Sequence, residues 1–264
     1  MMDERELPLD VAQETRGVRS TSPRGVGDHW RILAPLLVIG LAGVGLGVFY
    51  LTRHAAAPEP TPPRRDLAQE ARDDLERRSF RPLSAPLAAL LIDTSFEPTP
   101  TQAHPLLLQQ APDFTLLDVN GKHISLTGEF KKGPVVLVFY YGYLCDHCVS
   151  QLFAIDKDLA RFRELGATVL AISPDTAELT RSRFKQYGAF AFPVLSDPGN
   201  KVATKYETYV PSATAGQEGD LLHGTFIISR QGKIVWTNRG EAPFTENRTL
   251  LHEIARVEGK LPGK

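Results

Sequence analysis

The chain has 264 residues, a formal net charge of −1 and a hydrophobic content of 42%. This near-neutral balance, without a basic patch interleaved with aromatic residues, gives no reason to expect a nucleic-acid partner. Only two cysteines are present, and they lie three positions apart, which excludes a scaffold held by disulfides because a bridge between them would close a very small loop. The two cysteines are therefore expected to serve reactivity.

An uncharged stretch at residues 32–51 predicts a transmembrane helix. At about 1.5 Å per residue, twenty residues span about 30 Å, the thickness of a bilayer core. A shorter apolar core is typical of a cleaved signal peptide, although the alanines at 55–57 leave cleavage open. Arginines near the two ends slightly favour a cytoplasmic N-terminus. We expect a cytoplasmic tail (1–31), one membrane helix (32–52) and an extracytoplasmic, periplasmic remainder.

The next segment, residues 53–105, is interpreted as a stalk or linker. It begins with a proline-rich stretch that should be extended. Residues 66–78 are dense in charge at helical spacing, which predicts a solvated helix. The apolar run at 87–92 is too short to span a membrane and could dock onto the domain or a partner, and three prolines between 98 and 105 then interrupt regular structure. The stalk would hold a domain away from the membrane.

The remainder alternates between strand and helix patterns. An unbroken apolar run at 135–141 predicts a strand buried on both faces. Helices are expected from near Cys145, after Asp175 with capping-box spacing, and after Thr245 as a cap. The expected strands, with hairpins around 120–121 and 231–233, cover residues 114–117, 123–126, 135–141, 167–172, 225–229 and 234–237. This order predicts an α/β fold over 106–262, with a thioredoxin-like central mixed sheet flanked by helices.

The two cysteines form the motif Cys145-Asp146-His147-Cys148 at a predicted strand-to-helix turn. Backbone N–H groups at a helix N-terminus favour a thiolate, but their dipole supplies only about 0.3–1 kcal/mol at an exposed site. One pKa unit requires about 1.4 kcal/mol, so further contributions are needed from Cys148 and a protonated His147. We expect Cys145 to attack a substrate disulfide, Cys148 to resolve the mixed disulfide and His147 to tune the thiol pKa and the reduction potential.

A structural zinc site is the main competing interpretation of this motif. It normally needs four ligands, and the chain has neither a second cysteine pair nor suitably spaced histidines. We therefore expect a redox-active disulfide, Cys145–Cys148, and no other cofactor or metal. A protein thiol or disulfide would be the substrate, and a separate redox partner would reset the pair.

Four segments together resemble the AhpC/TSA (redoxin) family of the thioredoxin-like superfamily. They lie within residues 110–240 and read APDFTLLDVNGKHISL, VVLVFYYGYLCDHC, FPVLSDPGNKVATKY and GTFIISRQGKIVW. The resemblance implies a thioredoxin-like fold and antioxidant thiol chemistry. In the peroxide-binding motif of peroxiredoxins, Tyr141 stands at the proline position, Cys145 at the threonine, Cys148 at the peroxidatic cysteine and His223 at the arginine. The second cysteine makes the site look like that of a membrane-anchored dithiol oxidoreductase.

The resemblance also implies a substrate cleft and leaves alternatives open. The cleft would include Tyr141, His223 and Gly224, of which the glycine stands where thioredoxins carry a cis-proline. A thiol peroxidase would use Cys148 to attack peroxide and Cys145 to resolve. A copper-binding protein of the Sco type would use Cys145, Cys148 and His223 as ligands. A tethered interaction module that only retains the fold is the non-enzymatic alternative.

Overall fold

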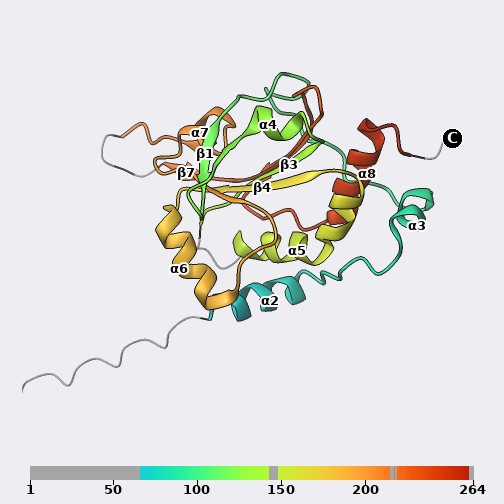
Figure 1. Cartoon of the computed structure of the whole chain (residues 1–264), viewed down its shortest axis with the longest axis horizontal. Coiled ribbons are helices and arrows are strands. Elements are labelled where there is room, and N and C mark those ends of the chain that lie inside the picture. The colour runs from blue at the N-terminus through green and yellow to red at the C-terminus, as the bar shows by residue number, and fades with distance from the viewer. Residues whose placement is uncertain (1–65, 143–147, 215–216, 218, 262–264) are drawn as a thin grey trace, which may run out of the picture. The chain divides into compact units, whose positions relative to one another are not determined.

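A computed structural model of the chain describes residues 66–142, 148–214, 217 and 219–261 (Figure 1). The predicted cytoplasmic tail and membrane helix, together with residues 53–65 of the predicted stalk, lie outside these residues. Within the described ranges, no helix is both long and apolar enough to cross a bilayer. The membrane anchor and the extracytoplasmic location therefore stay predictions.

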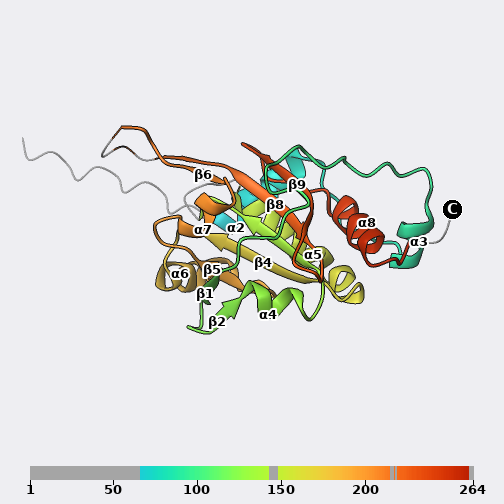
Figure 2. The same ribbon diagram turned by 90° about the horizontal axis from the view of Figure 1, so that it is seen from above.

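A seven-stranded mixed sheet forms the centre of the fold, in the order β2-β1-β5-β4-β3-β8-β9. Strands β3, β4 and β5 run parallel, and the outer pairings are antiparallel. Figure 2 shows β1 and β2 towards one edge and β9 at the other. A separate two-stranded ribbon joins β6 (Tyr209–Val210) to β7 (Asp220–Leu221). The strands of the sheet are β1 (Thr115–Asp118), β2 (His123–Ser125), β3 (Val135–Phe139), β4 (Thr168–Ser173), β5 (Val194–Ser196), β8 (His223–Ile228) and β9 (Ile234–Gly240).

Helices cover both faces of this sheet. Figure 1 shows α4 and α7 on one side and α2, α5 and α6 on the other. The last helix begins one residue later than predicted, because Glu246 and not Thr245 is the N-cap of α8. The helices are α2 (Leu67–Arg77), α3 (Leu87–Ile92), α4 (Leu126–Phe130), α5 (Cys148–Glu164), α6 (Ala177–Tyr187), α7 (Lys201–Lys205) and α8 (Asn247–Val257). The predicted mixed α/β sheet flanked by helices is thus confirmed.

Strand β3 lies inside the sheet, between β4 and β8, and all five of its residues are buried. Val136 and Val138 belong to the apolar cluster on the α5 side of the sheet, whereas Leu137 and Phe139 belong to the cluster on the α4 and α7 side. Side chains of a strand alternate between the two faces, so a strand covered on both sides must be apolar at every position. This explains the unbroken apolar run in the sequence.

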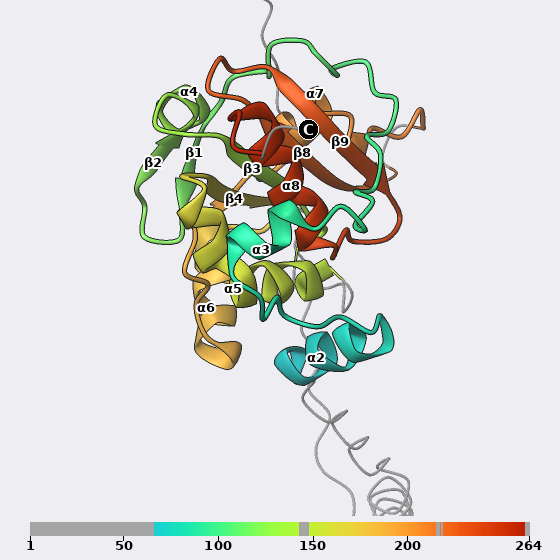
Figure 3. The same ribbon diagram turned by 90° about the vertical axis from the view of Figure 1, so that its right-hand side faces the viewer.

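The segment from residue 66 to 105 packs against the domain, which differs from the predicted stalk and solvated helix. Leu67 and Ala71 of α2 and Leu87 of α3 belong to the apolar cluster on the α5 side. Helix α2 contacts α5, and α3 contacts α8 (Figure 3). Apolar residues spaced four apart form one buried stripe on α2, and the many charged residues occupy its remaining surface. The high charge density therefore led to the prediction of a solvated helix, whereas α2 is amphipathic and buries its apolar stripe.

Residues 99–111 cover the edge of the sheet at β9. Backbone hydrogen bonds join Gln102 N to Thr237 O at 2.9 Å, Leu108 N to Ile234 O at 2.8 Å and Ile234 N to Gln109 O at 3.0 Å. The indole N–H of Trp236 also donates to Thr99 O, at 3.1 Å. An exposed edge strand offers unpaired backbone groups to other chains. Here the chain itself occupies many of those groups on β9.

Asp158 of α5 fastens the N-terminal segment to the last helix. Its carboxylate accepts the backbone N–H of Leu83 at 2.8 Å and the side-chain amide of Asn247 at 2.7 Å. Only 2% of Asp158 is exposed to solvent. Burying a carboxylate costs free energy unless hydrogen bonds compensate for the lost solvation, and these two donors provide that compensation. The donors in turn need Asp158 as an acceptor.

We expect Asp158→Ala to lower the free energy of unfolding by about 1–3 kcal/mol, because the part-buried N–H of Leu83 loses its acceptor and the buried amide of Asn247 loses one of two. The measurement is urea unfolding of the full chain. The control is Lys157→Ala on the neighbouring exposed position, which should change stability by no more than about 0.5 kcal/mol. Equal effects of the two substitutions would contradict the fastening role of Asp158.

Candidate active site

Cys148 is the first described residue of α5, and none of its surface is exposed. It belongs to the apolar cluster on the α5 side, together with Val138 of β3 and Tyr140, which directly follows β3. Residues 143–147, which include Cys145, Asp146 and His147, lie outside the described residues. The structure therefore describes one of the two predicted reactive cysteines, and the dithiol geometry stays a prediction.

Tyr141 and His223, two of the predicted cleft residues, are brought together by the fold. Tyr141 follows β3 and is half-buried, and His223 begins β8 with 2% of its surface exposed. Their rings stack, with centroids 4.6 Å apart and an interplanar angle of 25°. Residues 141 and 223 are far apart in sequence, and the antiparallel pairing of β3 with β8 brings them next to each other.

His223 and Cys148 lie on the same side of the sheet. Thr225, two residues after His223 on β8, accepts a hydrogen bond from the side-chain amide of Gln151 on α5 at 2.8 Å. Side chains two residues apart on a strand share a face. His223 therefore faces the side on which α5 and Cys148 lie.

Gly224, the third predicted cleft residue, has its neighbours on the other face. It pairs with Phe139 of β3 and Arg239 of β9. A Cβ atom here would lie 2.3 Å from Thr208 Cγ2 and 2.9 Å from Phe226 Cε2. The close approach of Thr208 leaves no room for a side chain, so packing explains this glycine.

Asp175 is a site residue that sequence reasoning missed. The capping-box spacing suggested that it caps the following helix, but the N-cap is Thr176, whose hydroxyl accepts the N–H of Leu179 at 3.2 Å. Only 9% of Asp175 is exposed, and burial raises the pKa of its carboxyl group from 3.8 to about 6, against the opposing effect of Arg183. Its position at the end of a buried strand was the available signal.

The Asp175 carboxylate packs against the backbone of Gly142. A Cβ atom on Gly142 would lie 2.6 Å from Asp175 Oδ2, and the φ angle of this glycine is +82°. Both the space and the backbone conformation therefore require glycine here. Gly142 is the last described residue before 143–147, so Asp175 contacts the residue that directly precedes this segment.

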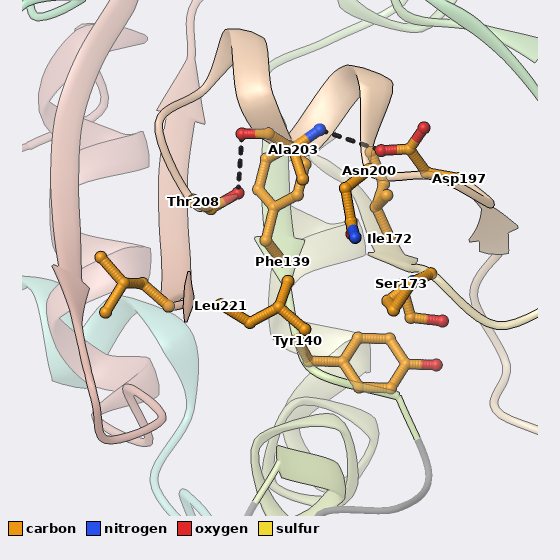
Figure 4. Close-up of a pocket in the computed structure, with 11 residues that line it drawn as sticks. Phe139, Tyr140, Ile172, Ser173, Asp197, Asn200, Ala203, Thr208 and Leu221 are labelled. Atoms are coloured by element: carbon orange, nitrogen blue, oxygen red, sulfur yellow. Dashed lines mark hydrogen bonds between the residues drawn. The ribbon is translucent and has the colours of Figure 1, made fainter. Parts of the chain in front are cut away.

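Tyr140 lies beside Asp175 and is buried with it. Burial is the main reason that the pKa of the Tyr140 phenol is raised, and the Asp175 carboxylate raises it further, whereas a hydrogen bond with Ser173 lowers it. Tyr140 is therefore a neutral phenol at physiological pH. Figure 4 shows Tyr140 and Ser173 at the ends of neighbouring strands.

The cavity in Figure 4 is about 10 Å³ in volume, which is about the size of a single water. On its far side, the Asp197 carboxylate accepts the N–H groups of Val202 and Ala203, each at 2.9 Å. The Thr208 hydroxyl donates to Ala203 O at 3.2 Å. These hydrogen bonds hold the two ends of α7 in place. The cavity is too small for a substrate, and the hydrogen-bonded walls leave no obvious way to enlarge it.

The predicted copper ligands cannot be compared as a set, because Cys145 is outside the described residues. Within the part of the chain that the structure describes, no group of three or more His, Cys, Asp and Glu residues could hold a metal ion. The copper alternative stays untested.

Comparison with known proteins identifies the family. Residues 107–237 match the model of the AhpC/TSA family. The chain is 36% identical over 149 residues to the chloroplastic peroxiredoxin Q of Sedum lineare, covering 54% of this chain and 76% of that protein. It is 32% identical over 127 residues to a proposed peroxiredoxin of Mycobacterium tuberculosis, covering 48% of this chain and 80% of that protein.

Among solved structures, the peroxidoxin BcpB from Mycobacterium tuberculosis is similar, with a TM-score of 0.51 and 23% identity. The match covers 59% of this chain and 98% of that one. This likeness shows the fold alone, and it confirms the predicted thioredoxin-like α/β fold. The sequence identity and coverage of the relatives show that the chain belongs to the AhpC/TSA family.

Proposed function

We propose that the chain is a thiol–disulfide oxidoreductase in which Cys145 attacks a substrate disulfide and Cys148 resolves the mixed disulfide. The observation that carries this proposal is the complete burial of Cys148 at the described start of α5. A buried sulfur is shielded from a large substrate in solution. It can react with a sulfur that is delivered next to it, which is the task of a resolving thiol.

The stacked rings of Tyr141 and His223 favour a disulfide over a peroxide as substrate. The resemblance to peroxiredoxins implies a proline and an arginine at these two positions. Here an imidazole and a phenol contact each other, and neither supplies the fixed guanidinium donors of an arginine. His147 would tune the thiol pKa and the reduction potential.

A thiol peroxidase is the second candidate function, and the names of the relatives favour it. The matched proteins of Sedum lineare and Mycobacterium tuberculosis are called peroxiredoxins. In this alternative, Cys148 attacks a peroxide, the O–O bond breaks, and the products are a Cys148 sulfenic acid and water or an alcohol. Cys145 then condenses with the sulfenic acid, which releases water and forms the disulfide.

The membrane anchor and the redox partner are proposed on the sequence alone. Residues 32–51 would anchor the protein in a membrane, with the redox domain on the extracytoplasmic side. A separate redox partner would return the Cys145–Cys148 pair to its starting state after each turnover. A thiol would reduce the disulfide if the pair reduces substrates, and a disulfide would reoxidise the dithiol if the pair oxidises them.

We expect Cys145→Ser to reduce insulin-disulfide reduction to the background rate, because the attacking sulfur is lost. Cys148→Ser should also stop turnover but accumulate a mixed disulfide between Cys145 and the substrate. The measurement is insulin turbidity together with mass spectrometry of the trapped adduct. Unchanged activity of Cys145→Ser would contradict the assignment of the nucleophile.

Peroxide consumption separates the two candidate functions with the same variants. If the protein is a peroxidase, hydrogen peroxide is consumed rapidly, the activity is lost in Cys148→Ser, and Cys145→Ser still completes one turnover. The oxidoreductase proposal predicts slow consumption in all three proteins. Rapid wild-type consumption with the peroxidase pattern would overturn it.

A further inference from the structure

Residues 99–111, which we call the strap, run along the β9 edge of the sheet and carry one buried histidine (Figure 3). Only 8% of His104 is exposed, and no other residue of the strap, all of which the structure describes, is buried. The rings of His104 and Phe226 of β8 form a T-shaped pair, with centroids 5.3 Å apart. The imidazole is therefore the main side-chain contact between the strap and the interior of the domain.

A hydrogen bond within the strap depends on the protonation state of this imidazole. The backbone N–H of Leu106 donates to Nδ1 of His104 at 3.1 Å. An imidazole nitrogen accepts a hydrogen bond only while it carries no proton, so the neutral ring has its proton on Nε2. If Nδ1 gains a proton, two N–H groups face each other and the Leu106 N–H loses its acceptor. The closed strap therefore favours neutral His104.

The charged groups around His104 also oppose a positive charge on the ring. Nε2 of His104 lies 4.0 Å from Glu207 Oε2, just after α7. Arg239 of β9 already engages this residue, because its guanidinium donates to Glu207 O at 2.7 Å and to Glu207 Oε2 at 3.2 Å. Burial and the Arg239 charge lower the pKa of His104 from 6.5, against the opposing effects of Glu207 and a hydrogen bond with the Tyr206 backbone.

The backbone bonds that hold the strap on β9 lie close to His104 on both sides. Two residues before it, Gln102 N donates to Thr237 O at 2.9 Å. Four residues after it, Leu108 N donates to Ile234 O at 2.8 Å. Leu108 itself is 66% exposed, so apolar burial adds little to this attachment. Displacement of the His104 ring would move the backbone between these two bonds.

We propose that His104 is a pH-sensitive latch, which holds the strap on β9 while its imidazole is neutral and releases the β9 edge when the imidazole is protonated. Once released, the backbone groups of β9 can pair with a strand of another chain. The latch is independent of the proposed thiol chemistry, because its contacts lie among residues that the structure describes at the β9 edge.

Proton linkage sets the size and direction of the effect. Because the pKa of His104 is lowered in the closed strap, its contribution to closure is full above pH 6.5 and is lost as the pH falls through the lowered pKa. If the closed strap excludes the imidazolium, the ratio of open to closed molecules rises by a factor of about 1 + 10^(6.5 − pH). This factor is about 1 at pH 8 and about 30 at pH 5.

Hydrogen–deuterium exchange of the full chain, resolved by mass spectrometry, tests the latch. Protection of residues 99–111 and 234–240 is compared at pH 8 and pH 5 after correction for intrinsic exchange, with residues 135–139 of β3 as the internal reference. In the wild type, the strap and β9 should lose protection by at least about tenfold at pH 5, while β3 does not change. His104→Gln retains an acceptor for the Leu106 N–H but cannot titrate, so its protection should be equal at both pH values.

His123→Gln is the matched control, because it makes the same change at an exposed position of β2, on the opposite edge of the sheet. This variant should behave as the wild type does. Equal protection of the wild-type strap at both pH values would overturn the proposal, as would an equal loss in the wild type and in His104→Gln. If His104→Gln does not fold, a pH series on the wild type decides. Loss of protection should then begin between pH 6.5 and 5, and a loss that begins only at lower pH, where carboxyl groups titrate, overturns the latch.

Discussion

The burial of β3 on both faces is the constraint on which the rest of the structure depends. Its side chains alternate between the two apolar clusters, so each face of the sheet is held against its covering helices by the same five residues. The chain leaves this rigid strand at Tyr140 and Tyr141 and reaches the cysteine-containing segment directly. Residues 143–147 therefore follow, within a few positions, a strand that is held on both of its faces.

The N-terminal part of the described chain extends this core instead of separating it from a membrane. Helix α2 adds apolar residues to the α5 side, Asp158 ties residue 83 to α8, and residues 99–111 hydrogen-bond to the edge of β9. Any membrane anchor would therefore connect to the domain through residues before 66. A second consequence is that the β9 edge is occupied by the chain's own segment, which limits pairing with another sheet.

The candidate site combines two pairs of neighbours from distant parts of the sequence. Tyr141 stacks on His223 across β3 and β8, and Asp175 packs on Gly142 across β3 and β4. Both pairs lie at the carboxyl end of β3, one towards β8 and the other towards β4. The proposed oxidoreductase function draws on the first pair, because the stacked rings stand where the family resemblance implies a peroxide-binding proline and arginine. Family membership alone would have suggested a peroxide site.

The sequence by itself determined the α/β fold, the buried central strand, the hairpins and the AhpC/TSA family, because strand alternation, turn residues and family motifs are local signals. It also identified Cys148, Tyr141 and His223 as candidates. Only the tertiary structure decided that residues 66–105 pack on the domain, that Thr208 requires Gly224, and that Asp175 faces Gly142 and Tyr140. Each of these depends on contacts between segments far apart in the chain, and burial, which sets the packing and the pKa of Asp175, exists only after those segments have met.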